Sequence, residues 1–455
     1  YRWGEDGLAG ICDRFQLLWF GLGLGDGGDN ILKERLFGLV PQQSNHGEDV
    51  KEYYYYLDAT PTHSYLKFLY KYPQQRFPYR QLIEESSRRG LEDPEYELLD
   101  THVFDEGRYF DVQVEYAKAD CQDICIRIEA FNRGPDDAHL TVLPHLWFRN
   151  TWNWGPESLP QPSLSVAQQS LEGVCLLADE SNAEPLSNLL YPYRLGKMWL
   201  YAQAGGTPLF TDNESNNRQL YGPRAQNRSK YVKDAFHRQI IHGENCTNPE
   251  RNGTKACIQY PLEIPAGKSR VILLRLTDSE DTHGIADVLN EAQHVVDMRR
   301  EEADEFYGSL HPPKATEDEC RIQRQALAGM IWTKQIYLFD VNQWLEGDRP
   351  DLPPPESRKK IRNQHWRHLN SMRILSMPDK WEYPWYAVWD VAFHTLPLAR
   401  LDPEFAKQQL LLFTREWYMH PNGQLPAYEW EFSDLNPPVH AWAVWRVYNM
   451  DRIQT

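Results

Sequence analysis

Alternating apolar and polar residues dominate the first part of the chain and predict β-strands. The clearest of these segments are residues 108–116, 123–131, 139–147 and 255–276. Turn residues rich in Gly and Pro separate them, as at residues 132–135 and 265–268. Strands at this spacing predict an antiparallel β-sandwich that occupies residues 1–280.

Helical periodicity replaces this alternation after residue 280. Residues 281–315 are heavily charged and predict a helical linker on the surface. A second helix is predicted from about Thr316 to Trp344, before a run of prolines breaks the chain. Shorter helices are expected around residues 385–398, from Asp402-Pro403 to about Tyr418, and after Pro437-Pro438. Helices of this length, separated by aromatic loops, predict that residues 316–455 form the first part of an α/α toroid that is incomplete in this chain.

Composition narrows the classes of function. The hydrophobic fraction of 41% and mean hydropathy of -0.66 are typical of a soluble globular protein, and no apolar run is long enough to cross a bilayer. A net charge of -17 without a Lys/Arg block makes nucleic acid an unexpected partner. Seven scattered cysteines favour reduced thiols and a cytoplasmic location, although four N-x-S/T sequons lie between residues 213 and 254.

Three glycines near the start of the chain match the dinucleotide-binding pattern G-x-G-x-x-G. They are Gly23, Gly25 and Gly28. Because no βαβ unit continues after them, a flexible glycine turn is the better interpretation.

Asp390 is the best catalytic candidate because aromatic residues surround it. Trp385, Tyr386 and Trp389 precede it, and His394 follows four residues later on the same helical face. A carboxyl group among such rings is partly desolvated, which raises its pKa and favours the protonated form that a general acid needs. An Asp that caps a helix or pairs with a buried Arg explains the same spacing equally well.

A second cluster lies in the loop at residues 422–442. Carboxylates stand beside aromatic faces there, at Tyr428, Glu429, Trp430 and Glu431. Sugar rings stack on aromatic faces, and carboxylates accept hydrogen bonds from sugar hydroxyls. Seven of the 16 tryptophans fall between residues 381 and 445, which favours sugar binding, whereas surface acids and a Trp-rich core are the alternatives.

Residues 382–394, EYPWYAVWDVAFH, resemble the general-acid motif of glycoside hydrolase family 63. GQLPAYEWEFSDLNPPVHAW resembles the companion loop of its prokaryotic and fungal cytosolic branch. The segments YRWGEDGLAGICDRFQ, HGEDVKEYYYYLDATPTHSYLK and LWFRNTWNWG are similar to N-terminal signatures of that branch. The resemblance spans nearly the whole chain, from Tyr1 to about Tyr448.

This resemblance implies a β-sandwich followed by an (α/α)6 toroid and hydrolysis of α-glucosidic bonds, in oligosaccharides or small glucosides, with inversion. It implies no organic cofactor and a carbohydrate as the partner, and we assign no metal ligand. Carried over to this sequence, it makes Asp390 the general acid. Trp385, Trp389 and the Glu429-Trp430 loop then line the sugar pocket, while His394 matches the motif without an assigned role.

The second carboxylate of an inverting enzyme, the base that activates water, has no matching motif in this chain. Either the chain is part of a longer protein or it has lost activity, and we expect residues 1–455 alone to be inactive. Two functions therefore stay open: an inverting α-glucosidase-like hydrolase and a catalytically incomplete sugar-binding or scaffold protein. A hydrolase of glucosylglycerate or mannosylglycerate is the runner-up among enzymes.

Overall fold

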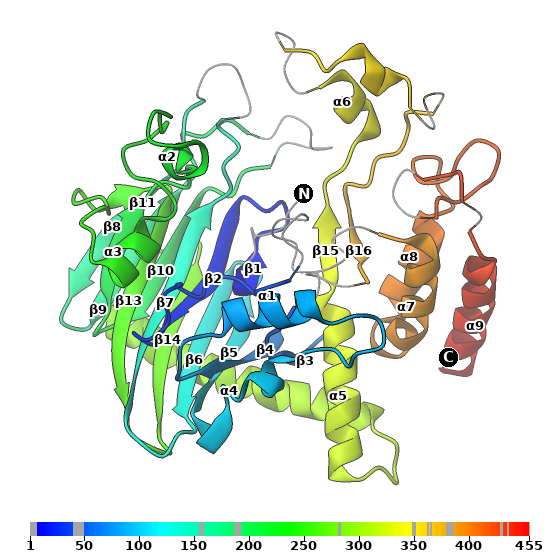
Figure 1. The fold of residues 1–455 in the computed structure, drawn as a ribbon. Coiled ribbons are helices and arrows are strands. Elements are labelled where there is room, and N and C mark those ends of the chain that lie inside the picture. The colour runs from blue at the N-terminus through cyan, green and yellow to red at the C-terminus, as the bar shows by residue number, and fades with distance from the viewer. Residues whose placement is uncertain are drawn as a thin grey trace.

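The computed structural model shows a large β-sandwich with a group of helices beside it (Figure 1). It describes residues 7–39, 50–153, 159–185, 193–280, 284–347, 352–361, 364, 366–378, 386–427, 431–434 and 436–454. The predicted sandwich and the change to helices after residue 280 are both confirmed.

Two antiparallel sheets form the sandwich. The five-stranded sheet has the order β1 (Leu8–Cys12), β2 (Leu18–Gly25), β7 (Ala138–Phe148), β13 (Lys255–Ile264) and β11 (Thr207–Thr211). The nine-stranded sheet has the order β12 (Asn252–Gly253), β8 (Ser163–Ser170), β9 (Gly173–Asp179), β10 (Lys197–Gln203), β14 (Ser269–Thr277), β6 (Asp123–Asn132), β5 (Tyr109–Asp120), β4 (Tyr65–Pro73) and β3 (Tyr54–Ala59).

Side-chain alternation explains how the sheets pack. Phe20, Leu22 and Leu24 occupy every second position of β2 and lie in one buried cluster with Ile126 and Ile128 of β6. Successive side chains of a strand point to opposite faces, so each sheet buries one apolar face against the other. The residues between them in β2, which are Gly21, Gly23 and Gly25, therefore lie on the outer face of the sheet.

Helices cover the outer faces of both sheets (Figure 1). On the five-stranded sheet lies α3 (Ala235–His242), which contacts β11, with α2 (Asn217–Tyr221) nearby, while Tyr79 at the start of α1 (Tyr79–Arg88) packs against Phe37. The long helix α4 (Ile285–Leu310) contacts the nine-stranded sheet and buries Val288, Ala292 and Val296 there. Short 3-10 turns occupy Leu98–Thr101, Asp105–Gly107 and Glu356–Lys359.

The remaining helices are α5 (Glu317–Trp332), α6 (Val341–Glu346), α7 (Val388–Leu401), α8 (Pro403–Leu412) and α9 (Val439–Gln454). The Trp332 indole of α5 donates to the Asp58 carbonyl oxygen at 2.9 Å and stacks on Tyr56, which joins α5 to β3. Asp402 caps α8 by accepting the Phe405 N–H at 3.0 Å, as the Asp-Pro pair predicts. The toroid and the domain boundaries stay predictions.

Two segments differ from the sequence-based expectation. The second helix begins with the Thr316–Glu319 capping box but ends at Trp332, because the next residues form β15 (Lys334–Tyr337) and pair with β16 (Arg373–Ser376). Residues 207–254, to which the sequence patterns above assign no strand or helix, contribute β11 to the sheet edge along with α2, α3 and β12. In both cases a short apolar stretch finds a partner strand that is distant in sequence.

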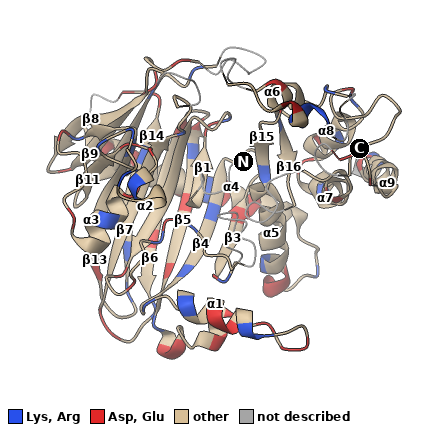
Figure 2. Ribbon diagram, turned by 45° about the horizontal axis from the view of Figure 1, so that its top comes forward, with Lys and Arg blue, Asp and Glu red and all other residues tan. Residues whose placement is uncertain are grey.

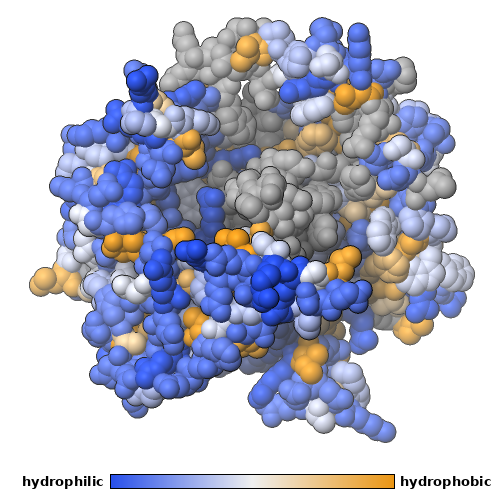
Figure 3. All heavy atoms as spheres, in the orientation of Figure 1, coloured by the Kyte–Doolittle hydropathy of each residue, from blue (hydrophilic) through white to orange (hydrophobic). Residues whose placement is uncertain are grey.

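The surface carries charges of both signs. Figure 2 shows Lys and Arg interspersed with Asp and Glu on α1 and along the sheets. Hydrophobic residues reach the surface on the side formed by α7 and α9 (Figure 3). All seven cysteines are free thiols, and none of the helices in the described residues has the length and apolar character needed to cross a bilayer.

Candidate active site

Helix α7 presents Asp390 on its open side. Successive helical residues are rotated by about 100°, so Trp389, Asp390, Phe393 and His394 share one side of the helix. The opposite side is buried against α5, α8 and α9. Its buried residues are Val388, Val391, Ala392, Thr395, Leu398, Ala399 and Leu401. The apolar pattern of α7 thus fixes the helix and turns the Asp390 side outward.

The Asp390 carboxyl group is partly buried, and burial raises its pKa above the ordinary value of 3.8. Within the described parts of the chain, its carboxylate makes no ion pair or hydrogen bond with another side chain. It also forms no side-chain cap at the start of α7. The capping and Arg-pairing alternatives therefore find no support among these residues. A raised pKa is the property that a general acid requires.

His394 lies one turn after Asp390 and faces the two-stranded sheet of β15 and β16 beside α7. Its Nδ1 lies 3.0 Å from Ser376 Oγ of β16, and burial lowers the pKa of His394 to about 4. The imidazole is therefore neutral at pH 7 and supplies no positive charge to Asp390. Ser376 is a contact that sequence reasoning missed, because the β15–β16 pairing that brings it there has no local signal.

Three exposed aromatic side chains, Trp389, Phe393 and Trp442, form a continuous row on this surface; we call it the aromatic row. The ring centroids of Trp389 and Phe393 are 6.4 Å apart, and those of Phe393 and Trp442 are 5.5 Å apart. All three side chains are 40–47% exposed, which is unusual for large rings packed against each other. Phe393 was not among the predicted site residues, although its i,i+4 spacing from Trp389 could have indicated it.

Two other predicted site residues point into the protein. Tyr386 is fully buried, and its ring packs against Tyr337, Phe413 and Tyr418. Glu431 is 1% exposed, and its carboxylate accepts the Ser433 N–H at 2.6 Å. Both were expected to touch substrate. Core packing and loop hydrogen bonds occupy their side chains, so neither lies on the exposed surface beside Asp390.

The remaining predicted site residues lie outside the described residues. They are Trp385, Tyr428, Glu429 and Trp430. Their roles stay predictions. Among the residues that the structure does describe, no group of three or more His, Cys, Asp and Glu side chains is arranged to hold a metal ion.

Residues 383–455 match the family model of the mannosylglycerate hydrolase MGH1-like glycoside hydrolase domain. This segment contains α7, α8, α9 and Asp390. The matched segment is therefore similar to a glycoside hydrolase domain.

The chain is also similar to an uncharacterized protein of Saccharomyces cerevisiae. The two are 43% identical over 493 residues, which cover 99% of this chain and 44% of that protein. This chain therefore spans less than half the length of the relative.

Solved structures show weaker similarity. A putative kojibiose phosphorylase from the human microbiome has a TM-score of 0.19 at 10% identity, covering 51% of this chain and 23% of the other. A galactose mutarotase-related enzyme from Lactobacillus acidophilus has a TM-score of 0.23 at 8% identity, covering 50% and 72%.

Proposed function

We propose that this protein is a glycoside hydrolase that cleaves α-glucosidic bonds with inversion, and that Asp390 is its general acid. The observation that carries the proposal is the position of Asp390. Its carboxyl group has a raised pKa, stands beside the aromatic row, and lies in the segment that matches a glycoside hydrolase domain. An acid beside a stacking surface is the arrangement that glycoside cleavage needs.

In the proposed reaction, a sugar ring stacks on the aromatic row with its glycosidic oxygen near Asp390. The carboxyl group gives its proton to that oxygen while the bond to the anomeric carbon breaks. Water attacks the anomeric carbon from the opposite face, and a second carboxylate takes the proton that the water loses. The products are a free alcohol and a sugar of inverted configuration.

The second carboxylate must stand about 6.5–9.5 Å from the acid to leave room for the water. Glu431 does not suit this role, because it is buried and its carboxylate is bonded to Ser433. The relative from Saccharomyces cerevisiae is more than twice as long as the matched region. We therefore propose that another part of a longer protein supplies the base and that α7–α9 belong to an (α/α)6 toroid.

The stereochemistry of the product tests the mechanism. Full-length protein acting on an α-glucoside should release the β-anomer first, and proton NMR of the fresh product distinguishes the two anomers. An α-anomer that appears first would mean a retaining mechanism and would refute the proposal. Binding of α-glucosides without any turnover would favour the sugar-binding alternative.

A hydrolase of glycerate glycosides is a second candidate, because the matched family model is named for mannosylglycerate hydrolase. Values of kcat/KM for glucosylglycerate, mannosylglycerate and neutral glucosylglycerol would distinguish the candidates. A preference for the glycerate-bearing substrates would support this candidate. Equal or better use of the neutral glucoside would favour the oligosaccharide-type activity.

A further inference from the structure

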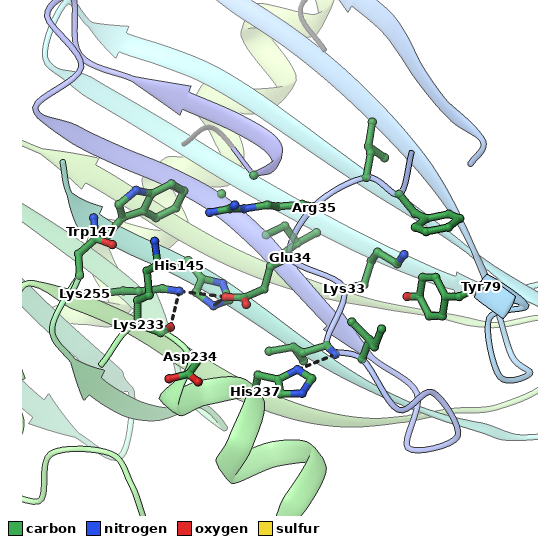
Figure 4. A pocket seen from close by; sticks show the side chains of 18 of the residues that line it. Lys33, Glu34, Arg35, Tyr79, His145, Trp147, Lys233, Asp234, His237 and Lys255 are labelled. Atoms are coloured by element: carbon green, nitrogen blue, oxygen red, sulfur yellow. Dashed lines mark hydrogen bonds and ion pairs between the residues drawn. The ribbon is translucent and has the colours of Figure 1, made fainter. Parts of the chain in front are cut away.

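A cavity of about 620 Å³ lies on the outer face of the five-stranded sheet, apart from the Asp390 surface (Figure 4). Its lining comes from β2, β7 and β13, from the segment at residues 31–37, and from α1 and α3. None of its described lining residues belongs to α7, α8 or α9. The proposed hydrolase mechanism makes no use of it.

Glycines keep this face of the sheet open. Gly21, Gly23 and Gly25 alternate along β2 with the apolar residues that face the core. Gly21 pairs with His145 of β7, and a Cβ atom on Gly23 would lie 2.5 Å from Cε1 of His145. Only glycine leaves room for the imidazole here. The pattern that resembled a dinucleotide turn is therefore mainly a strand shaped around His145.

His145 belongs to a charged group inside the cavity. Glu34 Oε1 lies 3.0 Å from Lys255 Nζ and 3.1 Å from His145 Nε2. Burial alone would raise the pKa of Glu34, but the charge of Lys255, together with the nearby His145 ring, lowers it well below its ordinary value. His145 Nδ1 lies 2.7 Å from the Leu143 carbonyl oxygen, which fixes the ring. The cavity thus contains an ionised carboxylate, that of Glu34, with the ammonium group of Lys255 beside it.

The charged side chains that line the cavity favour the binding of an anion. Four Lys or Arg residues line the cavity against two Asp or Glu residues, and one of the four, Lys33, forms an ion pair with the buried Glu52, which does not line the cavity. Glu34 is paired with Lys255, and Asp234 lies 3.8 Å from Arg238. Arg35 is exposed and makes no ion pair with any residue that the structure describes. A guanidinium at a cavity mouth binds carboxylate or phosphate groups in a bidentate manner.

Trp147 supplies an aromatic wall. Its indole stacks on Trp19 at a centroid distance of 6.2 Å and lines the cavity. In Figure 4 the Arg35 side chain extends toward Trp147, with Glu34, His145 and Lys255 next to it. An aromatic face beside hydrogen-bonding groups suits a polyhydroxylated ring.

We propose that this cavity binds a small sugar or polyol that carries a carboxylate or a phosphate group. Arg35 holds the anion, the ring lies against Trp147, and Glu34 accepts hydrogen bonds from hydroxyl groups. The site is separate from the one at Asp390, and the proposal does not depend on the hydrolase activity.

Calorimetric titration of the full-length protein tests the proposal with D-glucuronate and D-glucose 6-phosphate as probes. D-glucose and inorganic phosphate serve as the neutral and ring-free comparisons. We expect one or both anionic sugars to bind more tightly than either comparison. Arg35→Ala should weaken that binding about tenfold or more, because it removes a charge-assisted hydrogen bond. The matched control is Arg80→Ala, which changes an exposed arginine of α1 paired with Glu84.

Each other outcome contradicts the proposal. If neither anionic sugar binds, the cavity is not such a site. If D-glucose or inorganic phosphate binds as well as the anionic sugars, the ligand class is wrong. Binding that survives Arg35→Ala but is lost in Trp442→Ala would place the ligand at the aromatic row. Circular dichroism spectra of the variants establish that a loss of binding is not a loss of fold.

Discussion

The cavity in the sandwich and the open side of α7 each place a carboxyl group close to tryptophan, with opposite electrostatic results. Burial raises the pKa of both carboxyl groups when taken alone. At Glu34, Lys255 and His145 outweigh burial and keep the carboxylate ionised. At Asp390 no described cation opposes burial, so the pKa is raised. Aromatic neighbours alone therefore do not keep a carboxyl group protonated, because its pKa rises only where no positive charge offsets burial.

The largest expected effect follows from removing the acid. In the full-length protein, Asp390→Asn should lower kcat/KM on natural α-glucosides by about 10²–10⁴-fold, because the amide cannot protonate the leaving oxygen. A substrate with an activated phenol leaving group needs less protonation and should be affected less. Steady-state kinetics on both substrates measures the difference.

Asp318→Asn is the matched control, since Asp318 is an exposed carboxylate in the first turn of α5. It should leave both rates near the wild-type values. Wild-type turnover by Asp390→Asn would overturn the assignment of Asp390 as the acid. The contrast between Asp390 and Glu34 would then have no catalytic significance.

The second-largest effect is expected when a substitution breaks the ion pair in the cavity. Lys255→Met should lower the free energy of unfolding by about 1–3 kcal/mol at pH 7, because it leaves the Glu34 carboxylate without its cation. The folded-state pKa of Glu34 is depressed, so its stabilising contribution is present above about pH 4.5 and is lost as the pH falls below that. The difference between wild type and variant should therefore shrink in acid.

Denaturant unfolding of both proteins at several pH values measures this difference. Lys268→Met, in the exposed turn between β13 and β14, serves as the control and should change stability little. A gap that stays constant down to pH about 3 would show that Lys255 does not act through the charge of Glu34.

The third effect concerns the aromatic row. Trp442→Ala should raise KM for an α-glucoside by up to about tenfold, because one aromatic stacking partner is lost. Trp445→Ala is the matched control, since Trp445 lies on the same helix, is 64% exposed and stacks on Tyr448 instead. Equal effects of the two substitutions would mean that the row has no special role in sugar binding.

Local patterns in the sequence predicted much of this fold. Alternation identified β5, β6 and β7, and the Asp402-Pro403 pair identified the start of α8. These features depend on residues that are close together in the chain. The sequence also singled out Asp390 and Trp389, because helical spacing alone brings them to one side of α7.

Contacts between distant segments could not be predicted in this way. Ser376 reaches His394 only because β16 pairs with β15, and Trp442 joins the aromatic row only because α9 packs on α7. The sequence pattern assigned Gly23 to a turn, whereas the structure places it in β2. There His145, more than a hundred residues later, leaves no room for a side chain at Gly23. Tyr386 was predicted as a binding residue on spacing alone, whereas tertiary packing buries it.

The smallest expected effect tests whether His394 contributes a charge beside Asp390. Burial lowers the pKa of His394 to about 4, so the folded protein keeps it neutral through the pH range of activity. His394→Gln should then leave the alkaline limb of kcat/KM against pH, which reports the loss of the Asp390 proton, in place to within about half a pH unit. If His394 were a cation, its removal would raise the pKa of Asp390 and move that limb upward.

Stability measurements supply an independent readout of the same property. A histidine with a depressed folded-state pKa stabilises the fold fully above its ordinary pKa of 6.5, and that contribution is lost as the pH falls toward about 4. Between about pH 7.5 and 5.5, wild type should therefore lose roughly 1 kcal/mol more than His394→Gln. His63, whose pKa burial also lowers to about 4, is present in both proteins and cancels in the comparison. An equal loss in the two proteins would show that the pKa of His394 is not lowered in the folded protein. His394 could then carry a positive charge beside Asp390 at mildly acidic pH, which would weaken the contrast between Asp390 and Glu34.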